Sequence, residues 1–173
     1  MSHELPIKLL FVCHGNICRS PIAEYYFKSQ ARKAGLEHCF EVSSAATSSE
    51  EIGNPVYPLA KRVLAEHGIG CRGKVAQQMT TEMFDNADLV VVMDQENIAN
   101  TERLIQTEDH PKLKRLLDFV GPDNAAYSHR DVADPWYTRN FNKAWDDITV
   151  GCNALLKQLT DECNLTPEQN TSD

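Results

Sequence analysis

Two nearly unbroken apolar runs stand out along the chain, one near the N-terminus and one near its middle. Residues 7–12 read Ile-Lys-Leu-Leu-Phe-Val and residues 89–93 read Leu-Val-Val-Val-Met. Together the two runs contain a single charged side chain, that of Lys8. Short runs of this kind are typical of strands that are buried on both faces of a parallel sheet. Shorter apolar stretches at 40–42 and 116–120 predict two further strands.

Helical patterns alternate with these strands. Apolar residues at mostly three- and four-residue steps predict a long last helix over residues 141–163. Ser20, which a proline follows, is expected to cap a helix that stops at Gly35. Two more helices are expected over 55–67 and 94–104.

The alternation of strands and helices predicts the fold class. We expect a three-layer α/β fold, in which helices flank a small central parallel sheet. A chain of 173 residues can bury one sizeable core, and no internal repeat or linker divides it. A single domain over residues 1–163 and a polar, disordered tail over 164–173 are therefore expected. Residues 121–140, rich in Gly, Pro, Asp and Asn, predict a long loop of functional importance.

Composition and charge narrow the function classes. The formal net charge of -8 argues against binding to nucleic acid or to an anionic membrane, because both need a basic surface. No segment approaches the roughly 20 apolar residues that span a bilayer, and no signal peptide is expected. Six cysteines without an export signal indicate reduced thiols in a cytoplasmic protein. Their spacing lacks the pairs that hold structural zinc, so no metal is expected.

The most informative segment joins the first predicted strand to the first predicted helix. Open α/β sheets bind ligands at such turns, where backbone N–H groups and the helix dipole favour an anion. A nucleotide-binding loop is excluded because Gly-x4-Gly-Lys-Ser/Thr does not occur. We expect a phosphate group to be bound by the loop residues His14, Gly15, Asn16, Ile17, Cys18 and Arg19.

Cys13, at the first position of this loop, is the candidate nucleophile. A helix N-terminus and an arginine both stabilise a thiolate, so Cys13 would need no separate base. Arg19 presents a planar fork that suits two oxygens of one phosphoryl group, and Ser20 could donate a hydrogen bond to the sulfur. The alternative is that Cys13 is a buried strand-end thiol and Arg19 a solvated helix residue.

Two other loop residues are expected to shape its backbone. Gly15 permits conformations that a Cβ would resist. Asn16 tolerates left-handed geometry and can brace the loop through its side chain.

The segment Asp-Pro-Trp-Tyr at 134–137 offers a proton donor. Cleavage of a phosphate ester leaves an alkoxide or phenoxide that needs a proton. Asp134 is the candidate because the following proline restricts it to extended geometry, whereas nothing constrains Asp131 in this way. Trp136 and Tyr137 offer flat walls for a phenyl ring. The alternative is an Asp-Pro turn whose aromatic side chains pack into the core.

Cys18 shares the loop with Cys13. A loop wrapped around one anion can bring the two Cα atoms within the roughly 4.4–6.8 Å that a disulfide needs. A reversible disulfide between them would protect the nucleophile from over-oxidation. The alternative is a Cys18 thiol that only packs beneath the loop.

Residues 12–21 match Val-Cys-x-Gly-Asn-x-Cys-Arg-Ser-Pro, the signature of a family that this chain resembles, the low-molecular-weight protein tyrosine phosphatases. The similarity continues through segments 43–47, 52–55, 67–69, 93–94 and 134–137. It implies an enzyme that hydrolyses phosphotyrosine in proteins through a cysteinyl-phosphate intermediate and releases inorganic phosphate, without a metal or a cofactor.

The resemblance also implies a role for each candidate residue. It makes Cys13 the nucleophile, Arg19 the phosphate-binding residue and Asp134 the general acid. The residues that hold the loop in shape would be Asn16, Ser20 and Ser44, and those that line the substrate cleft Glu50, Trp136 and Tyr137.

Two segments depart from the family pattern. Glu50 and Glu51 stand where many relatives have an aromatic residue in the cleft; the alternative is that both are solvated charges far from it. Gly73, just before Lys74, falls near where relatives often place a histidine beside the loop-supporting serines.

Three rival functions are weighed against this reading. An arsenate reductase on the same fold needs further cysteines close together, whereas the other four here are scattered. Protein-arginine phosphatases of the family tend to carry Thr where Ile17 stands. A phosphate-binding module without turnover would not need both Cys13 and Asp134.

Overall fold

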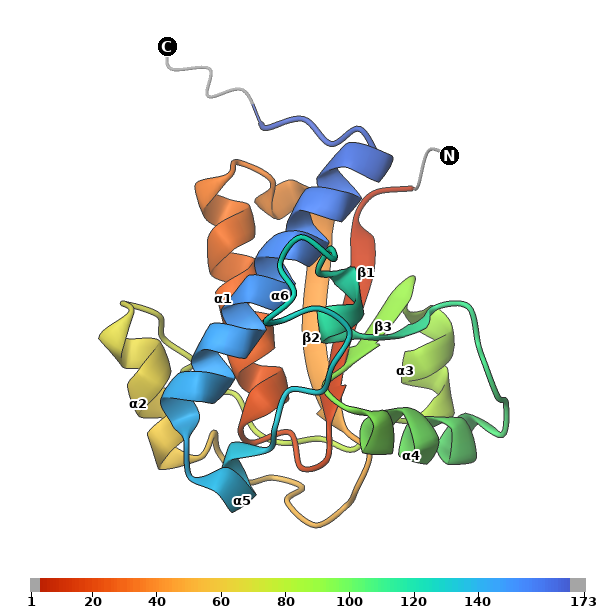
Figure 1. Ribbon diagram of the computed structural model, residues 1–173. Coiled ribbons are helices and arrows are strands. Elements are labelled where there is room, and N and C mark those ends of the chain that lie inside the picture. The colour runs from red at the N-terminus through yellow and green to blue at the C-terminus, as the bar shows by residue number, and fades with distance from the viewer. Residues whose placement is uncertain (1–3, 169–173) are drawn as a thin grey trace.

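A computed structural model describes residues 4–168 and confirms the predicted three-layer α/β fold (Figure 1). In this part of the chain one sheet holds four parallel strands in the order β2-β1-β3-β4. The strands are β1 (Ile7–Cys13), β2 (Phe40–Ala46), β3 (Leu89–Val92) and β4 (Leu113–Arg115). The two apolar runs of the sequence form β1 and β3, the central pair.

Helices cover both faces of this sheet. One face carries α1 (Arg19–Lys33), α2 (Pro58–Glu66) and the long α6 (Phe141–Glu162), and the other carries α3 (Thr81–Asn86) and α4 (Gln95–Ile105) (Figure 1). Three short helical segments complete the fold: η1 (Glu37–Cys39), η2 (Leu116–Phe119) and α5 (Pro135–Thr138).

Strand β1 contributes to the core on both sides. Leu9 and Phe11 belong to the larger hydrophobic cluster, beneath α1 and α6, while Leu10 and Val12 belong to the cluster beneath α3 and α4. Successive side chains of a strand point to opposite faces, so a strand between two helical layers must be apolar at nearly every position. This is why residues 7–12 lack an alternating pattern.

The strand predicted at 116–120 is wrong. Residues 116–119 form the 3₁₀ helix η2, and the fourth strand lies just before it, at Leu113–Arg115. Leu116 and Leu117 are fully buried, and η2 packs against α6. A short apolar run indicates burial but does not distinguish a strand from a turn of buried helix.

Other boundaries also shift. Helix α2 begins at Pro58 rather than at 55, and α3 and the short α5 were not expected. Ser20 is not the cap of α1: the helix starts at Arg19 after Cys18, and Ser20 lies in its first turn. The predicted stop at Gly35 is correct, since its backbone is left-handed (φ 73°) and follows the last helical turn.

Residues 164–168 can be placed, whereas the rest of the predicted tail, 169–173, lies outside the described residues. Leu165 is buried beside Ile7 and Leu36, and the Glu168 N–H donates to the Gly35 carbonyl at 2.9 Å. The division at residue 163 stays a prediction. Over residues 4–168, no helix is long and apolar enough to cross a membrane.

Candidate active site

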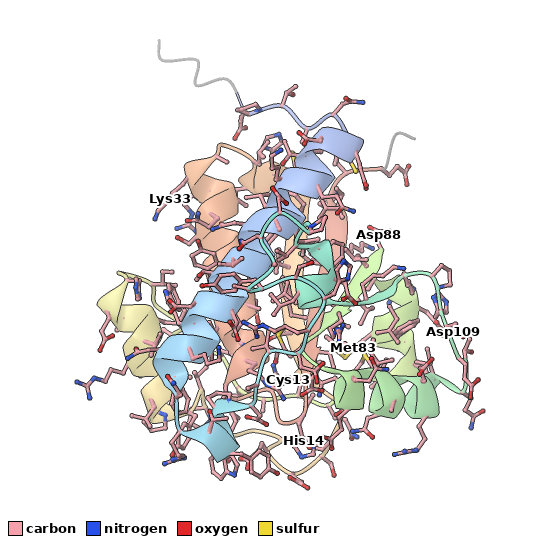
Figure 2. All side chains as sticks on the ribbon, viewed as in Figure 1. Cys13, His14, Lys33, Met83, Asp88 and Asp109 are labelled. Carbon is pink, nitrogen blue, oxygen red and sulfur yellow. The ribbon has the colours of Figure 1, made fainter. Side chains whose placement is uncertain are left out.

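A cavity of about 110 Å³ opens at the C-terminal end of β1. Figure 2 shows Cys13 and His14 at this end of the strand, toward α5. Three segments far apart in the sequence line the cavity, contributing Cys13, His14, Gly15, Ile17, Cys18, Arg19, Glu50, Glu51, Asp134, Trp136 and Tyr137. All three residues predicted to be catalytic and all three predicted cleft residues therefore meet here.

The loop after β1 is held from outside through its carbonyl groups. Backbone N–H groups of Thr47, Ser48 and Tyr57 donate to the carbonyl oxygens of Cys13, His14 and Ile17 at 3.0, 3.1 and 2.8 Å. With these carbonyls turned outward, the loop can present N–H groups to its centre, the arrangement that binds anions. The N–H of Asn16 does so, since it points to the Cys13 sulfur at 3.3 Å.

Asn16, rather than Gly15, supplies the unusual backbone geometry of the loop. Asn16 has a φ of 59°, in the left-handed region, as expected for this residue type. Gly15 is not among the residues of positive φ, so the conformational freedom expected of it is not used in this way. A Cβ at Gly15 would lie 3.4 Å from the Glu51 Cγ.

A chain of hydrogen bonds leads from the nucleophile candidate into the interior. The Gln77 N–H donates to the Asn16 Oδ1 at 3.1 Å, which orients the amide. The Asn16 Nδ2 then donates to two hydroxyl oxygens, Ser20 Oγ at 2.8 Å and Ser44 Oγ at 2.9 Å. Ser44 donates its own proton to Glu24, at 2.5 Å.

These directions determine what Ser20 does. Its oxygen accepts from Asn16, so its proton is free for the Cys13 sulfur, 3.0 Å away. A hydroxyl that donates to sulfur stabilises a thiolate. The geometry therefore fits the other role expected of Ser20, that of a hydrogen-bond donor to the Cys13 sulfur.

Glu24 ends this chain and was missed by sequence reasoning. Its side chain is 5% exposed and contacts two lysines, Lys28 at 2.6 Å and Lys74 at 3.5 Å. Lys74 also donates to the Ser44 carbonyl at 3.0 Å. Burial lowers the pKa of Lys74, although the negative charge of Glu24 opposes this. Lys74, next to Gly73, therefore lies beside Ser44, one of the residues expected to support the loop.

Arg19 is held along one edge. Its side chain is 2% exposed, and its Nη1 donates to Asp94 at 2.6 Å and to the Val132 carbonyl at 2.8 Å. Its Nη2 lies 3.3 Å from the Asp134 carboxylate. Burial alone would lower the pKa of Arg19, but the neighbouring Cys13, Asp94 and Asp134 raise it above its usual value. Within residues 4–168, no protein acceptor occupies the Nε–H, so that edge can serve a phosphoryl group.

Asp94 is a second residue whose part sequence reasoning missed. One carboxylate oxygen accepts from the Asn97 N–H at 2.7 Å and caps α4, and the other holds Arg19. A signal was present, because Asp94 follows the β3 segment at the carboxyl edge of the sheet, where α/β folds place ligand-contacting residues.

Asp134 caps the short helix α5. Its Oδ1 accepts from the Trp136 N–H at 3.0 Å, and its Oδ2 faces Arg19. Asp131, the weaker candidate, does not line the cavity. It accepts hydrogen bonds from Arg115 and from the Gln95 backbone, both at 2.9 Å.

The cleft side chains remain accessible. Trp136 and Tyr137 are 45% and 80% exposed, so they are not packed into the core as the alternative held. Glu50 and Glu51 line the cavity rather than lying far from it. The His14 Nε2 lies 3.1 Å from the Glu50 carboxylate, and this contact links the loop after β1 to the segment that carries Glu50 and Glu51.

Cys18 is a buried free thiol, like Cys13, and both residues line the cavity. Burial raises the pKa of Cys18, and the nearby Cys13 and Asp134 add to this effect. A disulfide between the two residues stays a prediction.

Comparisons with known proteins show similarity over most of this chain. The family model described as "Low molecular weight phosphotyrosine protein phosphatase" matches residues 8–165. The low molecular weight protein-tyrosine-phosphatase YfkJ of Bacillus subtilis is 38% identical over 159 residues, which cover 92% of this chain and 99% of YfkJ. PtpA of Staphylococcus aureus, named likewise, is 31% identical over 163 residues, or 92% of this chain and 97% of PtpA.

Solved structures resemble this chain in fold as well. The crystal structure of YfkJ superposes with a TM-score of 0.86 at 37% identity and covers 93% of this chain and 99% of its own. The YwlE arginine phosphatase also superposes, with a TM-score of 0.79 at 30% identity over 92% of this chain and all of the other.

Proposed function

Because the chain belongs to the low molecular weight phosphotyrosine protein phosphatase family, we propose that Cys13, Arg19 and Asp134 carry out its hydrolysis of phosphotyrosine. The chain is a protein-tyrosine phosphatase by this membership. The observation that carries the residue assignment is the meeting of Cys13, Arg19 and Asp134 in one cavity, although Asp134 follows Cys13 by more than a hundred residues.

In the first step the Cys13 thiolate attacks the phosphorus atom, while Arg19 and the loop N–H groups hold the phosphoryl oxygens. A sulfur–phosphorus bond forms and the bond to the phenolic oxygen breaks. The departing oxygen takes the electron pair, and protonated Asp134 gives it a proton. Tyrosine leaves, and phosphocysteine remains.

In the second step a water molecule attacks the phosphorus atom of the intermediate. The Asp134 carboxylate takes a proton from this water. The sulfur–phosphorus bond breaks, inorganic phosphate leaves and the thiolate forms again. The hydrogen bond that Ser20 donates stabilises the thiolate as it departs.

The cleft favours an aromatic substrate. Trp136 and Tyr137 offer flat surfaces at the cavity mouth for a phenyl ring. Phosphoserine is shorter, so its phosphorus atom would stop short of the sulfur and lose the near-attack geometry. Phosphotyrosine-containing proteins are therefore the proposed partners.

Phosphoarginine is a second candidate substrate. One observation favours it: the carboxylates of Glu50 and Glu51 line the cavity and could accept hydrogen bonds from a guanidinium group. A structural relative is itself named an arginine phosphatase. Phosphotyrosine remains the first proposed substrate because the aromatic side chains of Trp136 and Tyr137 line the cavity.

Two further properties belong to the proposal. A thiolate nucleophile must stay reduced, which supports a cytoplasmic location. The chemistry above assigns no step to a metal or another cofactor, so we propose that none is needed.

The test compares peptides that carry phosphotyrosine, phosphoserine or phosphoarginine, each with and without EDTA, and with vanadate as an inhibitor. We expect phosphotyrosine to be hydrolysed fastest, EDTA to have no effect and vanadate to inhibit. The Cys13→Ser variant should lose turnover yet still bind phosphate, because Ser keeps the shape and loses the thiolate. Substantial residual hydrolysis by this variant would remove Cys13 from its role.

A further inference from the structure

The C-terminal end of α5 makes a contact that none of the roles above uses. Arg139, which directly follows α5, has a left-handed backbone with a φ of 58°. Its Nη2 donates a hydrogen bond of 3.1 Å to the Tyr57 hydroxyl. Its guanidinium carbon lies 5.8 Å from the centre of the Tyr57 ring and 6.0 Å from that of Trp136, within the range of cation–π attraction.

Tyr57 joins this contact to the phosphate loop. Its backbone N–H donates to the Ile17 carbonyl at 2.8 Å, so its backbone is tied to the loop. Its ring meets Trp136 edge to face, with ring centres 5.1 Å apart, and stacks on Phe141 at 5.7 Å. One residue thus contacts the loop through its backbone and the helix of the proposed acid through its side chain.

Helix α5 needs such support. It has four residues, far fewer than the about 12–15 that make an isolated helix even marginally stable. Pro135 is buried, whereas Trp136 and Tyr137 are 45% and 80% exposed, so burial in the core holds little of this helix. The N-terminal end of α5 is held by the contact of Asp134 with Arg19, and its C-terminal end by the hydrogen bond from Arg139 to Tyr57.

We propose that Tyr57 and Arg139 are positioning residues that hold α5 so that the Asp134 carboxyl faces the oxygen of the leaving group. This inference rests on the proposed role of Asp134 as general acid. Neither residue lines the cavity, so both act through the placement of Asp134. Proton transfer is sensitive to such placement, because the donor must lie within hydrogen-bond reach of the oxygen.

The experiment measures kcat/KM for a series of aryl phosphates whose leaving groups range from nitrophenols to unsubstituted phenol. The variants are Arg139→Gln, which removes the guanidinium, and Tyr57→Phe, which removes the hydroxyl and keeps the ring. Arg139→Lys retains the positive charge. Arg62→Gln is the matched control: Arg62 is an exposed arginine of α2 that pairs with Glu66 and does not line the cavity.

With poor leaving groups, Arg139→Gln should lower kcat/KM about threefold to tenfold, the worth of one exposed hydrogen bond or cation–π contact. With nitrophenyl phosphates, which need little help from an acid, its rate should match that of the parent. Tyr57→Phe should follow the same pattern, Arg139→Lys should restore part of the loss, and Arg62→Gln should show none. In an Asp134→Asn background, Arg139→Gln should have no further effect.

Other results would overturn the inference. Suppose that the loss of kcat/KM in Asp134→Asn grows as the leaving group becomes poorer, but the losses in Arg139→Gln and Tyr57→Phe do not. The contact between Arg139 and Tyr57 then does not position the acid. If Arg139→Gln instead raises KM equally for every substrate, Arg139 attracts the phosphate by its charge. If Asp134→Asn is itself insensitive to the leaving group, the proposed acid fails, and this inference fails with it. Thermal unfolding of each variant separates these results from loss of the fold.

Discussion

The Nη2 atom of Arg19 lies 3.3 Å from a carboxylate oxygen of Asp134, so the proposed phosphate-binding group and the proposed acid touch each other. Asp94 and the Val132 carbonyl hold the Nη1 of the same guanidinium. A phosphoryl group that binds to the Nε and Nη2 edge would compete with Asp134 and leave the contact to Asp94 in place. Substrate binding is therefore expected to turn the Asp134 carboxyl from Arg19 toward the leaving group.

We predict that Asp134→Asn lowers the rate with phenyl phosphate about 10²–10⁴-fold, the usual contribution of a positioned proton donor. The loss should shrink with nitrophenyl phosphates, whose leaving groups need little protonation. Measurement of kcat/KM across the leaving-group series checks this. An equal loss for good and poor leaving groups would count against Asp134 as the acid.

A second prediction concerns Glu24, which accepts a hydrogen bond from the Ser44 hydroxyl. Glu24 thereby orients the series of hydrogen bonds that leads to the Cys13 sulfur. Gln at this position can donate as well as accept, so the proton of Ser44 need no longer point inward. Glu24→Gln should lower kcat/KM about tenfold, the worth of one hydrogen bond to a charged group. It should also slow the alkylation of Cys13 by iodoacetate.

The control for this variant is Glu66→Gln, a partly exposed carboxylate of α2 that pairs with Arg62. It should leave both rates unchanged. If Glu24→Gln alkylates as fast as the parent while its thermal stability falls, Glu24 stabilises the fold without orienting the network.

A third prediction concerns oxidation by peroxide, which converts the Cys13 thiolate to a sulfenic acid. The Cys18 thiolate can then attack this sulfur, forming the disulfide and expelling hydroxide. Because burial raises the pKa of Cys18, little of it is ionised at neutral pH, and the reactive fraction grows as the pH rises. Recovery of activity with dithiothreitol should therefore be more complete after oxidation at about pH 8 than at about pH 6.

The comparison for this experiment is Cys18→Ser, which lacks the resolving thiol. Its recovery should be incomplete at every pH and should not improve as the pH rises. If it recovers as well as the parent, Cys18 only packs beneath the loop and the alternative holds.

A fourth prediction concerns Glu50 and Glu51 at the cavity mouth. Their charges should repel acidic peptides and favour neutral or basic residues around the phosphotyrosine, an effect that salt weakens. The double variant Glu50→Gln, Glu51→Gln should lose this preference in kcat/KM at low salt. A preference that survives the change would show that other residues set it, and the preference for tyrosine would keep its own test.

The sequence by itself was enough for the parts that depend on neighbouring residues. The buried strands, the loop that begins at Cys13 and the last helix all appear as local patterns of apolar, glycine and polar residues. The left-handed backbone of Asn16 belongs to this group, since it follows from the residue's own chemistry. The strand expected at 116–120 failed because an apolar run reports burial and leaves the backbone shape open.

Tertiary structure alone decided which distant residues meet. The sequence places Asp94 after a buried strand and Glu24 within a helix, but it names a partner for neither. Parallel pairing of β1 with β2 and β3 brings Asp94 beside Arg19 and Glu24 beside Ser44. The directions of the hydrogen bonds behind Cys13 likewise depend on a backbone N–H, that of Gln77, from a distant segment. Local composition names the groups that can do chemistry, whereas their distances and proton directions arise only when the packed sheet fixes them in space.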